Sequence, residues 1–254
     1  MAIVFNNVSY LGEIKDMSFE IENNKITGII GSSGSGKSTV IDLMSGVFEP
    51  SRGSILYEEA GVVYQNVHDQ FFYNSVKEEF IYFLRVHHIM NIEKKMFDAI
   101  KMVGFDISIL DASPFELSLS EQKKLSLALV LSINPKVILL DDVFFGLDDK
   151  SKESMIRLIR KLKIRYGRTI VVVSRDVNLI YRISDKVILI DNGEVVKISD
   201  KYDIFTDVEL LEKCNLPTPK LVEFSNIVKS KKNIDLGFRD DINDLMKDIY
   251  RFVR

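Results

Sequence analysis

The 254-residue chain has no tryptophan and only one cysteine, and it lacks any long apolar run. The single cysteine, Cys214, excludes a disulfide within the chain, so nothing requires an oxidising compartment. Without a run of about 18 apolar residues, we expect no segment to cross a membrane. The N-terminal segment MAIVFNNVSY lacks a basic region followed by an apolar stretch, so we expect no signal peptide. These absences together predict a cytoplasmic protein.

The charge balance is close to neutral, with 34 Lys and Arg residues against 37 Asp and Glu residues and a formal net charge of −3. This balance argues against a general nucleic-acid-binding protein, which is usually basic. Hydrophobic residues make up 46% of the chain and charged residues 28%, which is typical of globular proteins and excludes extensive disorder. The length suits one or two domains with a sizeable core.

Strands that alternate with helices predict an α/β fold with a mostly parallel sheet. Three continuous apolar runs are typical of strands buried on both faces, namely Val137–Leu140, Thr169–Ser174 and Val187–Ile190. The β-rich segments near the N-terminus are Ala2–Val8, Met17–Ile21 and Lys25–Ile30. Helical apolar spacing marks Lys37–Gly46, Val76–Met90, Glu93–Val103, Glu121–Ile133 and Ser151–Arg165.

Turn-forming residues mark several boundaries between these elements. The segment Asp191-Asn192-Gly193-Glu194 predicts a tight hairpin turn. Gly53 and Gly61 are expected to act as breakers around another turn and strand. Near the C-terminus, a single helical stripe is predicted from Ile242, Leu245, Met246 and Ile249.

A glycine-rich segment predicts a phosphate-binding loop. It reads Gly31-Ser32-Ser33-Gly34-Ser35-Gly36-Lys37-Ser38, followed by Thr39, and it fits G-x-x-x-x-G-K-S/T at every fixed position. Glycines let backbone N–H groups turn toward phosphate oxygens, and the helix that begins near Lys37 adds the positive end of its dipole. Lys37 can reach the β- and γ-phosphates, and Ser38 can supply a hydroxyl to Mg²⁺. The alternative is a chance Gly/Ser-rich turn, which the apolar strand before the motif and the amphipathic helix after it disfavour.

The strand Val137-Ile138-Leu139-Leu140 delivers Asp141 at its C-terminal end, which is the Walker B pattern. In an open parallel sheet, ligands bind at the carboxyl ends of the strands, and the phosphate loop lies at that edge as well. Asp141 is therefore predicted to be a Mg²⁺ ligand, either directly or through water. The alternative is that Asp141 caps the helix that follows.

Up to about Ser199, the chain resembles the ATPase subunits of ABC transporters. The matching elements, in the family's order, are the phosphate loop, Gln65 after Val62-Val63-Tyr64, Leu117-Ser118-Leu119-Ser120-Glu121, Asp141-Asp142 and Gly146-Leu147-Asp148. More narrowly, the chain is similar to the ATPases of energy-coupling factor (ECF) transporters. That similarity is carried by Val63-Tyr64-Gln65, Asp69-Gln70-Phe71-Phe72, Ser75-Val76, Asn134-Pro135-Lys136 and Ile204-Phe205, and by a C-terminal extension.

The resemblance implies an ABC-type ATPase domain at residues 1–200. This domain would have a mostly parallel core sheet, an N-terminal antiparallel β portion and a helical subdomain inserted at about residues 75–124. Residues 201–254 would then form a small C-terminal extension, which is a candidate dimerisation element.

The resemblance also implies ATP and Mg²⁺ as ligands. Residues 31–39 would bind the nucleotide, Mg²⁺ would be held by Ser38, Gln65 and Asp141, and the catalytic roles would fall to Asp142, Gln65 and Arg175. Two ATPase subunits would pair head to tail, with each ATP between one phosphate loop and the other subunit's signature, Ser118 to Glu121, and Asp148. Integral membrane subunits would bind near His68–Ser75, so the chain would attach peripherally to the inner face of the cell membrane.

Two departures affect the site built on the chain's own phosphate loop. The family's general base is usually Glu, but the residue after Asp141 is Asp142, whose carboxylate is one methylene shorter. Arg175 stands at the position of the switch histidine; it can contact a γ-phosphate but cannot act as a neutral imidazole acceptor. The alternatives are an acid at the start of a helix for Asp142 and a surface salt bridge for Arg175.

Two further departures affect the signature and the adenine site. The signature glycines, which permit close backbone approach, are replaced by Leu119 and Ser120, and Leu119 could obstruct the partner's nucleotide. Tyr10 is the nearby aromatic residue that could stack on adenine, and a core position is its alternative.

Because a homodimer would carry every one of these defects twice, we expect a heterodimer with a second ABC ATPase subunit. In it, this chain would bind ATP well and hydrolyse it slowly or not at all. The sequence therefore predicts the ATP-binding subunit of an ABC-type importer, most like the ECF type. The alternative is a non-hydrolysing nucleotide-binding subunit that regulates or completes a membrane or other complex.

Overall fold

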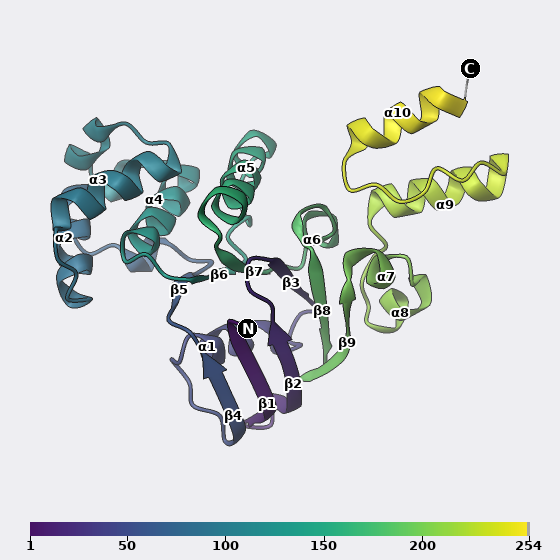
Figure 1. Cartoon of the computed structure of the whole chain (residues 1–254), viewed down its shortest axis with the longest axis horizontal. Helices are drawn as coiled ribbons and strands as arrows, with labels where there is room; N and C mark the ends of the chain where they lie inside the picture. Colours follow the sequence, from purple (N-terminus) through teal and green to yellow (C-terminus); the bar gives the residue numbers. More distant parts are fainter. Residues whose placement is uncertain (253–254) are drawn as a thin grey trace.

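The computed structural model describes residues 1–252, and a six-stranded sheet forms its centre (Figure 1). The strands run in the order β5-β6-β7-β3-β8-β9, and all neighbours are parallel except β8 and β9. Their bounds, in that order, are Ala60–Val63, Val137–Asp141, Thr169–Val173, Ile26–Ile30, Lys186–Asp191 and Glu194–Asp200. Every residue of β3, β6 and β7 is buried, as the continuous apolar runs predict.

A second, antiparallel sheet of three strands lies beside the first, in the order β2-β1-β4 (Figure 1). Its strands are Ile3–Tyr10 (β1), Ile14–Ile21 (β2) and Arg52–Tyr57 (β4). Helix α1 (Lys37–Met44) shares one apolar core with both sheets through Val40, Ile41, Leu43 and Met44. A mostly parallel sheet and an N-terminal antiparallel portion confirm the predicted fold class.

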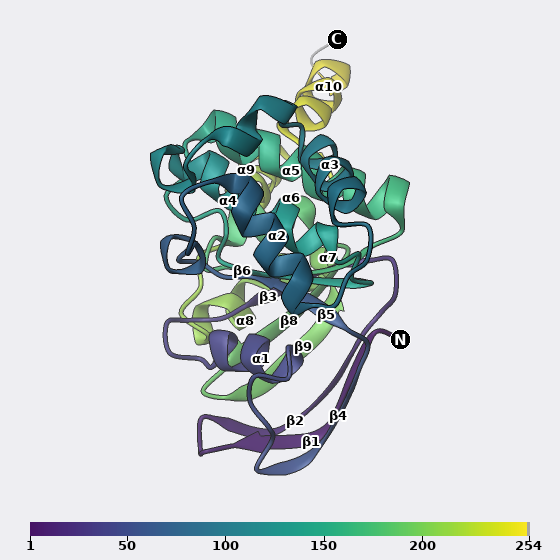
Figure 2. The same ribbon diagram turned by 90° about the vertical axis from the view of Figure 1, so that its left-hand side faces the viewer.

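Helices α2 (Val76–Val86), α3 (Ile92–Val103) and α4 (Leu119–Ser132) form a helical lobe on one side of the central sheet, which faces the viewer in Figure 2. Short 3₁₀ helices connect this part of the chain, at His68–Gln70, Ile107–Asp111 and Pro114–Glu116. Apolar side chains of the lobe form one buried core with apolar side chains from one face of the central sheet. Helix α5 (Asp149–Tyr166) and helix α6 (Val177–Ile183) cover the same sheet farther along.

Between β9 and residue 252 the chain forms four helices, with α9 and α10 farthest from the antiparallel sheet (Figure 1). They are Lys201–Phe205 (α7), Val208–Lys213 (α8), Lys220–Lys232 (α9) and Ile242–Phe252 (α10). An ion pair between Lys201 and Asp240 joins the start of this part to the segment before α10. Leu245 of α10 is buried, which agrees with the predicted helical stripe.

The hairpin between β8 and β9 forms at the predicted turn. Asn192 and Gly193 have φ angles of 48° and 79°, the left-handed conformation that a two-residue turn of this kind requires. A Cβ atom on Gly193 would lie 2.0 Å from the carbonyl oxygen of Glu13, so only glycine fits there. The turn thereby presses against the start of β2.

Two glycine predictions are wrong, because both residues lie inside strands. Gly53 belongs to β4 and Gly61 to β5. Gly61 is needed for close packing, since a Cβ atom there would lie 2.3 Å from Cγ1 of Val130 on α4. Helix α2 also ends at Val86, before the predicted Met90, and His88 after it has a φ of 54°.

Candidate functional site

The phosphate loop connects the end of β3 to the start of α1, at the carboxyl edge of the central sheet. Gly34 and Gly36 have φ angles of 79° and 94°, which side chains rarely adopt. Gly31 has no room for a side chain, since a Cβ atom would lie 2.1 Å from the carbonyl oxygen of Ile190. Three of the motif's glycines are therefore required by the backbone itself.

Lys37 is buried and directed into its own loop. Its ammonium nitrogen donates hydrogen bonds to the carbonyl oxygens of Gly31 (2.9 Å) and Ser32 (2.7 Å) and to Oγ of Ser35 (3.2 Å). Burial lowers the pKa of Lys37, and so does the positive charge of Arg175. A cation that is partly desolvated and close to another cation is a strong site for an anion.

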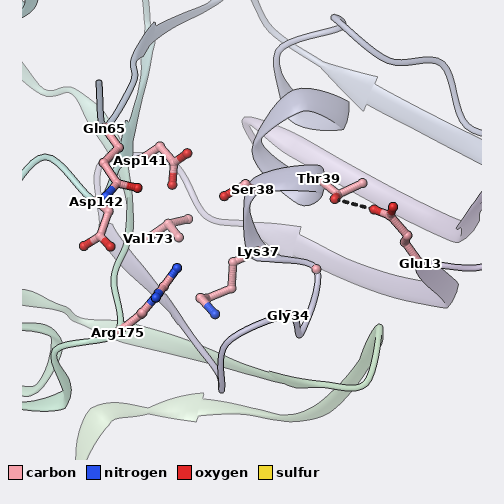
Figure 3. A pocket seen from close by; sticks show the side chains of 11 residues that line it. Glu13, Gly34, Lys37, Ser38, Thr39, Gln65, Asp141, Asp142, Val173 and Arg175 are labelled. Carbon is pink, nitrogen blue, oxygen red and sulfur yellow. Dashed lines mark hydrogen bonds between the residues drawn. The ribbon is translucent and has the colours of Figure 1, made fainter. Parts of the chain in front are cut away.

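A cavity of about 380 Å³ brings together residues that are far apart in the sequence (Figure 3). Predicted residues line most of it: Gly34, Gly36, Lys37, Ser38, Thr39, Gln65, Asp141, Asp142 and Arg175. Val173 and Glu13 complete the lining, and neither was predicted to be a site residue. The phosphate loop, the Walker B carboxylate and the residues after β5 and β7 thus surround one space.

Asp141 ends β6 and is only 8% exposed. Burial raises the pKa of its carboxyl group and the neighbouring charge of Asp142 raises it further, while hydrogen bonding with Ser38 lowers it. A bound cation would relieve both causes of the increase. Asp141 does not cap the next helix, because the N-cap of α5 is Asp148.

Asp142 is held by the neighbouring strand and by Ser174. Its backbone N–H donates to the carbonyl oxygen of Val173 (3.0 Å), and its φ of 44° lies in the left-handed region. Its Oδ1 accepts a hydrogen bond from the hydroxyl of Ser174 (3.1 Å). The carboxylate is therefore positioned at the cavity wall, and Ser174 is a positioning residue that the sequence did not single out.

Gln65 and Arg175 line the first cavity and also a second one beside it, of about 460 Å³. Asp142 lines both as well, and the second cavity extends to Lys152 and Asp176. Within residues 1–252, Arg175 takes part in no ion pair, so the salt-bridge alternative finds no partner. Its guanidinium group is exposed and directed toward the space around Lys37 (Figure 3).

The signature segment begins α4 through a reciprocal cap. The hydroxyl and the backbone N–H of Ser118 donate to Oε2 of Glu121 (2.6 and 2.9 Å), and the N–H of Glu121 donates back to Ser118 (3.4 Å). These hydrogen bonds lower the pKa of Glu121. The two donors of Ser118 that could bind a phosphate are thus engaged by a carboxylate of the same chain.

Leu119 contacts its own chain. Its side chain packs against the core, and a Cβ atom on Gly146 would lie 2.9 Å from its Cδ2. Buried Lys123, one turn farther along α4, donates to the carbonyl oxygen of Phe145. Both contacts join the signature helix to the segment between Asp142 and α5. Lys123 gave no signal in the sequence, because a lysine in a helix is usually exposed.

Asp148 and Tyr10 are among the predicted residues that do not line the cavity. Asp148 caps α5, accepting hydrogen bonds from the N–H and the hydroxyl of Ser151 (2.9 Å each). Tyr10 stacks on Phe48, with ring centroids 5.0 Å apart, and it lines a different hollow. Glu13, which follows the turn after Tyr10, lines the cavity instead.

Comparison with known proteins identifies the family of the chain. The ABC transporter family matches residues 14–144. The energy-coupling factor transporter ATP-binding protein EcfA2 of Staphylococcus epidermidis is 30% identical over 263 residues, which cover 92% of this chain and 92% of that protein. CbiO1 from Clostridium perfringens, part of the ABC transporter complex cbiONQ, has a TM-score of 0.73 at 24% identity and covers 88% of this chain and 98% of its own. The dimeric cassette MJ0796 bound to ADP and Pi has a TM-score of 0.69 at 23% identity, covering 78% and 98%.

The two solved structures support the fold, while the family match and the sequence relative support the assignment of the chain to the family. The phosphate loop and Asp141 lie at one edge of the sheet and line the same cavity. The chain therefore belongs to the ABC transporter ATP-binding family as an ABC-type ATPase, and it is similar to the ATP-binding subunits of ECF transporters.

Proposed function

We propose that the chain is the ATP-binding subunit of an ECF-type importer, which binds ATP with Mg²⁺ but hydrolyses it slowly or not at all. The observation that carries this proposal is the composition of the cavity. Lys37, Ser38 and Asp141, to which we assign the binding of the phosphates and Mg²⁺, line the same cavity as Asp142 and Arg175, which replace the usual catalytic side chains.

The donor set fits Mg²⁺ together with a nucleotide. Ser38, Gln65 and Asp141 offer a hydroxyl, an amide oxygen and one carboxylate, which are the oxygen ligands this cation prefers. Within the described part of the chain, no three His, Cys, Asp or Glu side chains gather in a metal cluster. The cation would therefore arrive with the phosphates, as is usual for Mg²⁺ in nucleotide sites.

Slow hydrolysis follows from the position of Asp142. Its carboxylate is one methylene shorter than the usual Glu, and Ser174 holds one of its oxygens. A general base must lie about 3 Å from the proton that it takes, and an error near 1 Å costs about a hundredfold in rate. Arg175 adds positive charge near Lys37 but has no neutral nitrogen that could accept a proton.

Pairing with a different ATPase subunit is supported by the signature. Leu119 and Ser120 replace the two glycines of the signature, and both donors of Ser118 are engaged by Glu121, so they would have to leave it to bind the phosphates of a partner's ATP. Leu119 packs on its own chain, so we infer that loss of the glycine backbone, rather than steric obstruction, is the defect of the signature. A partner with an intact signature would complete the site on this chain's loop.

An exposed aromatic patch on the helical lobe is our candidate surface for a membrane subunit. Phe72 and Tyr82 are 71% and 46% exposed, and Tyr73 completes the patch, with its ring centroid 5.2 Å from that of Tyr82. Buried Glu79 fixes this segment, since its Oε1 accepts the N–H groups of Phe72 and Tyr73 (2.5 Å each). An apolar patch rimmed by polar residues is typical of a protein interface.

Attachment to the inner face of the cell membrane is part of the proposal and would depend on this patch. None of the helices in residues 1–252 has the length and apolar character to span a bilayer. We further propose that residues 1–200 are the ATPase domain, that residues 75–124 are its helical subdomain, and that residues 201–254 are an extension that contributes to dimerisation.

The second candidate is a non-hydrolysing nucleotide-binding subunit with a regulatory or structural role. The same two features favour it, namely the short carboxylate of Asp142 and the engaged donors of Ser118. The candidates differ in their partners, since only the transporter subunit must bind an integral membrane protein.

Affinity purification of the tagged chain from detergent-solubilised membranes of its host tests the proposal. We expect a second ABC ATPase and an integral membrane protein to be recovered with it. The double variant Phe72→Ser/Tyr82→Ser is expected to lose the membrane protein and keep the ATPase. Ile164→Ser, which changes a 77% exposed residue on α5, is the matched control and is expected to keep both. Recovery without any membrane protein would contradict the transporter assignment.

A further inference from the structure

The carboxylate of Glu13 lies at the proposed nucleotide cavity, although Glu13 belongs to none of the sequence motifs described above. It lines the same cavity as Lys37 and Ser38. Its Oε2 accepts a hydrogen bond from the hydroxyl of Thr39 (2.9 Å), as Figure 3 shows. The second carboxylate oxygen, Oε1, receives no hydrogen bond within residues 1–252. An ionised carboxylate can accept about four hydrogen bonds, so Glu13 has acceptors left for a ligand.

The backbone under Glu13 is fixed from two sides. The N–H of Glu13 donates to the carbonyl oxygen of Tyr10 (2.9 Å), which closes the turn at Leu11 and Gly12. The N–H of Lys15 donates to the carbonyl oxygen of Gly193 (2.8 Å), and Gly193 itself leaves no room for a Cβ atom against Glu13. The carboxylate is therefore presented from a preorganised strand end, which reduces the entropy cost of binding.

The order of the residues along the cavity indicates which part of a nucleotide would contact Glu13. Asp142 and Arg175 lie on one side, Lys37 and Ser38 in the middle, and Thr39 and Glu13 on the other side (Figure 3). Lys37 of such a loop reaches the β- and γ-phosphates, and Ser38 reaches Mg²⁺. The nucleoside would then extend toward Thr39 and Glu13.

The chemistry of a carboxylate selects hydroxyl groups over phosphates at that end. A carboxylate repels phosphate oxygens but accepts strong hydrogen bonds from hydroxyl donors. The ribose 2′- and 3′-hydroxyls are adjacent donors, which suits the two oxygens of one carboxylate. Among the described residues that line the cavity there is no aromatic ring, and Tyr10 is stacked on Phe48, so recognition of the nucleoside needs another group.

We propose that Glu13 binds the ribose hydroxyls of ATP and makes the site selective for ribonucleotides over 2′-deoxyribonucleotides. This inference rests on the proposed function, because it requires that the cavity binds ATP. Glu13 would thus be a ribose-binding residue that lies outside the phosphate loop.

Equilibrium titration of the full chain with ATP and with 2′-deoxy-ATP, both with Mg²⁺, tests the proposal. We expect the wild type to bind ATP about tenfold more tightly than 2′-deoxy-ATP, as for the loss of one charge-assisted hydrogen bond. Glu13→Ala is expected to reduce that ratio to within about twofold. Glu13→Gln keeps the size of the side chain and one oxygen, so it is expected to give an intermediate ratio. This variant keeps the test decisive if Glu13→Ala does not fold.

Glu20→Ala is the matched control, since it removes an exposed glutamate from β2, the strand that follows Glu13, away from the cavity, and is expected to keep the wild-type ratio. Equal binding of the two nucleotides by the wild type, or an unchanged ratio in both Glu13 variants, would overturn the inference and leave the proposed function standing. Failure of the wild type to bind either nucleotide would overturn the proposed function as well. Inosine triphosphate lacks the adenine amino group; if Glu13→Ala changed only the ratio of ATP to inosine triphosphate, Glu13 would read the base, which contradicts ribose binding.

Discussion

The Ser174 hydroxyl donates a hydrogen bond of 3.1 Å to Oδ1 of Asp142 and so joins the segment after β7 to the residue that follows the Walker B carboxylate. Ser174 also accepts a hydrogen bond from the N–H of Asp176 (3.2 Å), so its own orientation is fixed. Asp142 is held from its backbone as well, through Val173. A carboxylate restrained at both its backbone and its side chain has little freedom to reach farther into the cavity.

Lengthening this side chain should restore hydrolysis. The double variant Asp142→Glu/Arg175→His is expected to raise ATP turnover by about tenfold to a hundredfold, because the carboxylate would regain about one carbon–carbon bond of reach. Glutamate fits the left-handed backbone at position 142 less readily than aspartate, so a loss of about 1 kcal/mol in the free energy of unfolding should accompany the change. Phosphate release measured with the partner subunit present checks this expectation. An unchanged rate in a folded variant would mean that the slow step lies elsewhere.

The raised pKa of Asp141 predicts that its ionised carboxylate, which the metal site needs, lowers the stability of the fold. A carboxyl group whose pKa is higher in the folded state than its ordinary 3.8 binds its proton more tightly when folded. Its ionisation therefore lowers the free energy of unfolding as the pH rises through the raised pKa, and this cost is absent below the ordinary value of 3.8. Asp141→Asn should stabilise the protein at pH 7, with the gain shrinking as the pH falls toward 3.8.

Urea unfolding of the wild type and of Asp141→Asn at several pH values measures this difference. The same variant should lose the Mg²⁺-dependent part of its ATP affinity, since the carboxylate is the charged ligand of the predicted metal site. A variant that is less stable at pH 7, or that keeps the full effect of Mg²⁺, would contradict our reading of Asp141.

Replacing Ser118 tests its role as the cap of α4. Ser118→Ala should reduce the free energy of unfolding by about 1 kcal/mol, because one hydroxyl cap is lost. The hydrogen bonds of Ser118 lower the pKa of Glu121, so the stability they contribute is present above the ordinary value of 4.5. The part from the hydroxyl–carboxylate bond is lost as the pH falls through the lowered pKa, so the difference between the two proteins should narrow there, while the part from the Glu121 N–H remains. Denaturant unfolding across this pH range is the measurement, and a pH-independent difference would argue against the pair.

Gly61→Ala should destabilise the protein by about 1–3 kcal/mol, because the added methyl group would overlap Val130 of α4. Gly104→Ala is an informative comparison, since position 104 has open space but a φ of 82°. It should cost about 1 kcal/mol through backbone strain alone. Thermal unfolding of both variants separates packing from strain, and equal stability of Gly61→Ala and wild type would contradict the packing account.

The parts of the site that were predictable from sequence depend on local patterns. The phosphate loop is contiguous, so Gly36 and Lys37 identify it without knowledge of the fold. Asp141 follows a run of apolar residues, and the turn at Asn192 and Gly193 is encoded by two adjacent residues. In each case, the residues that determine the structure are neighbours in the chain.

The parts that could not be predicted depend on contacts between distant segments. Glu13 enters the cavity because β2 packs beside α1 and the β8–β9 turn, which no residue near Glu13 reveals. Lys123 is buried because Phe145 offers a carbonyl oxygen from a different segment. Glycine is typical of turns, but Gly61 lies in a strand, and α4 packs so closely against that strand that a Cβ atom at position 61 would overlap it. Tertiary packing decides each of these positions.

Parallel measurement of ATP binding and ATP turnover by the purified chain tests the central claim most directly. The account predicts that the wild type binds ATP with Mg²⁺, that Lys37→Ala weakens this binding by at least about tenfold, and that both turn over ATP equally slowly, far below the roughly 1–10³ s⁻¹ of ordinary enzymes. Fast turnover by the wild-type chain alone, abolished by Lys37→Ala, would contradict it.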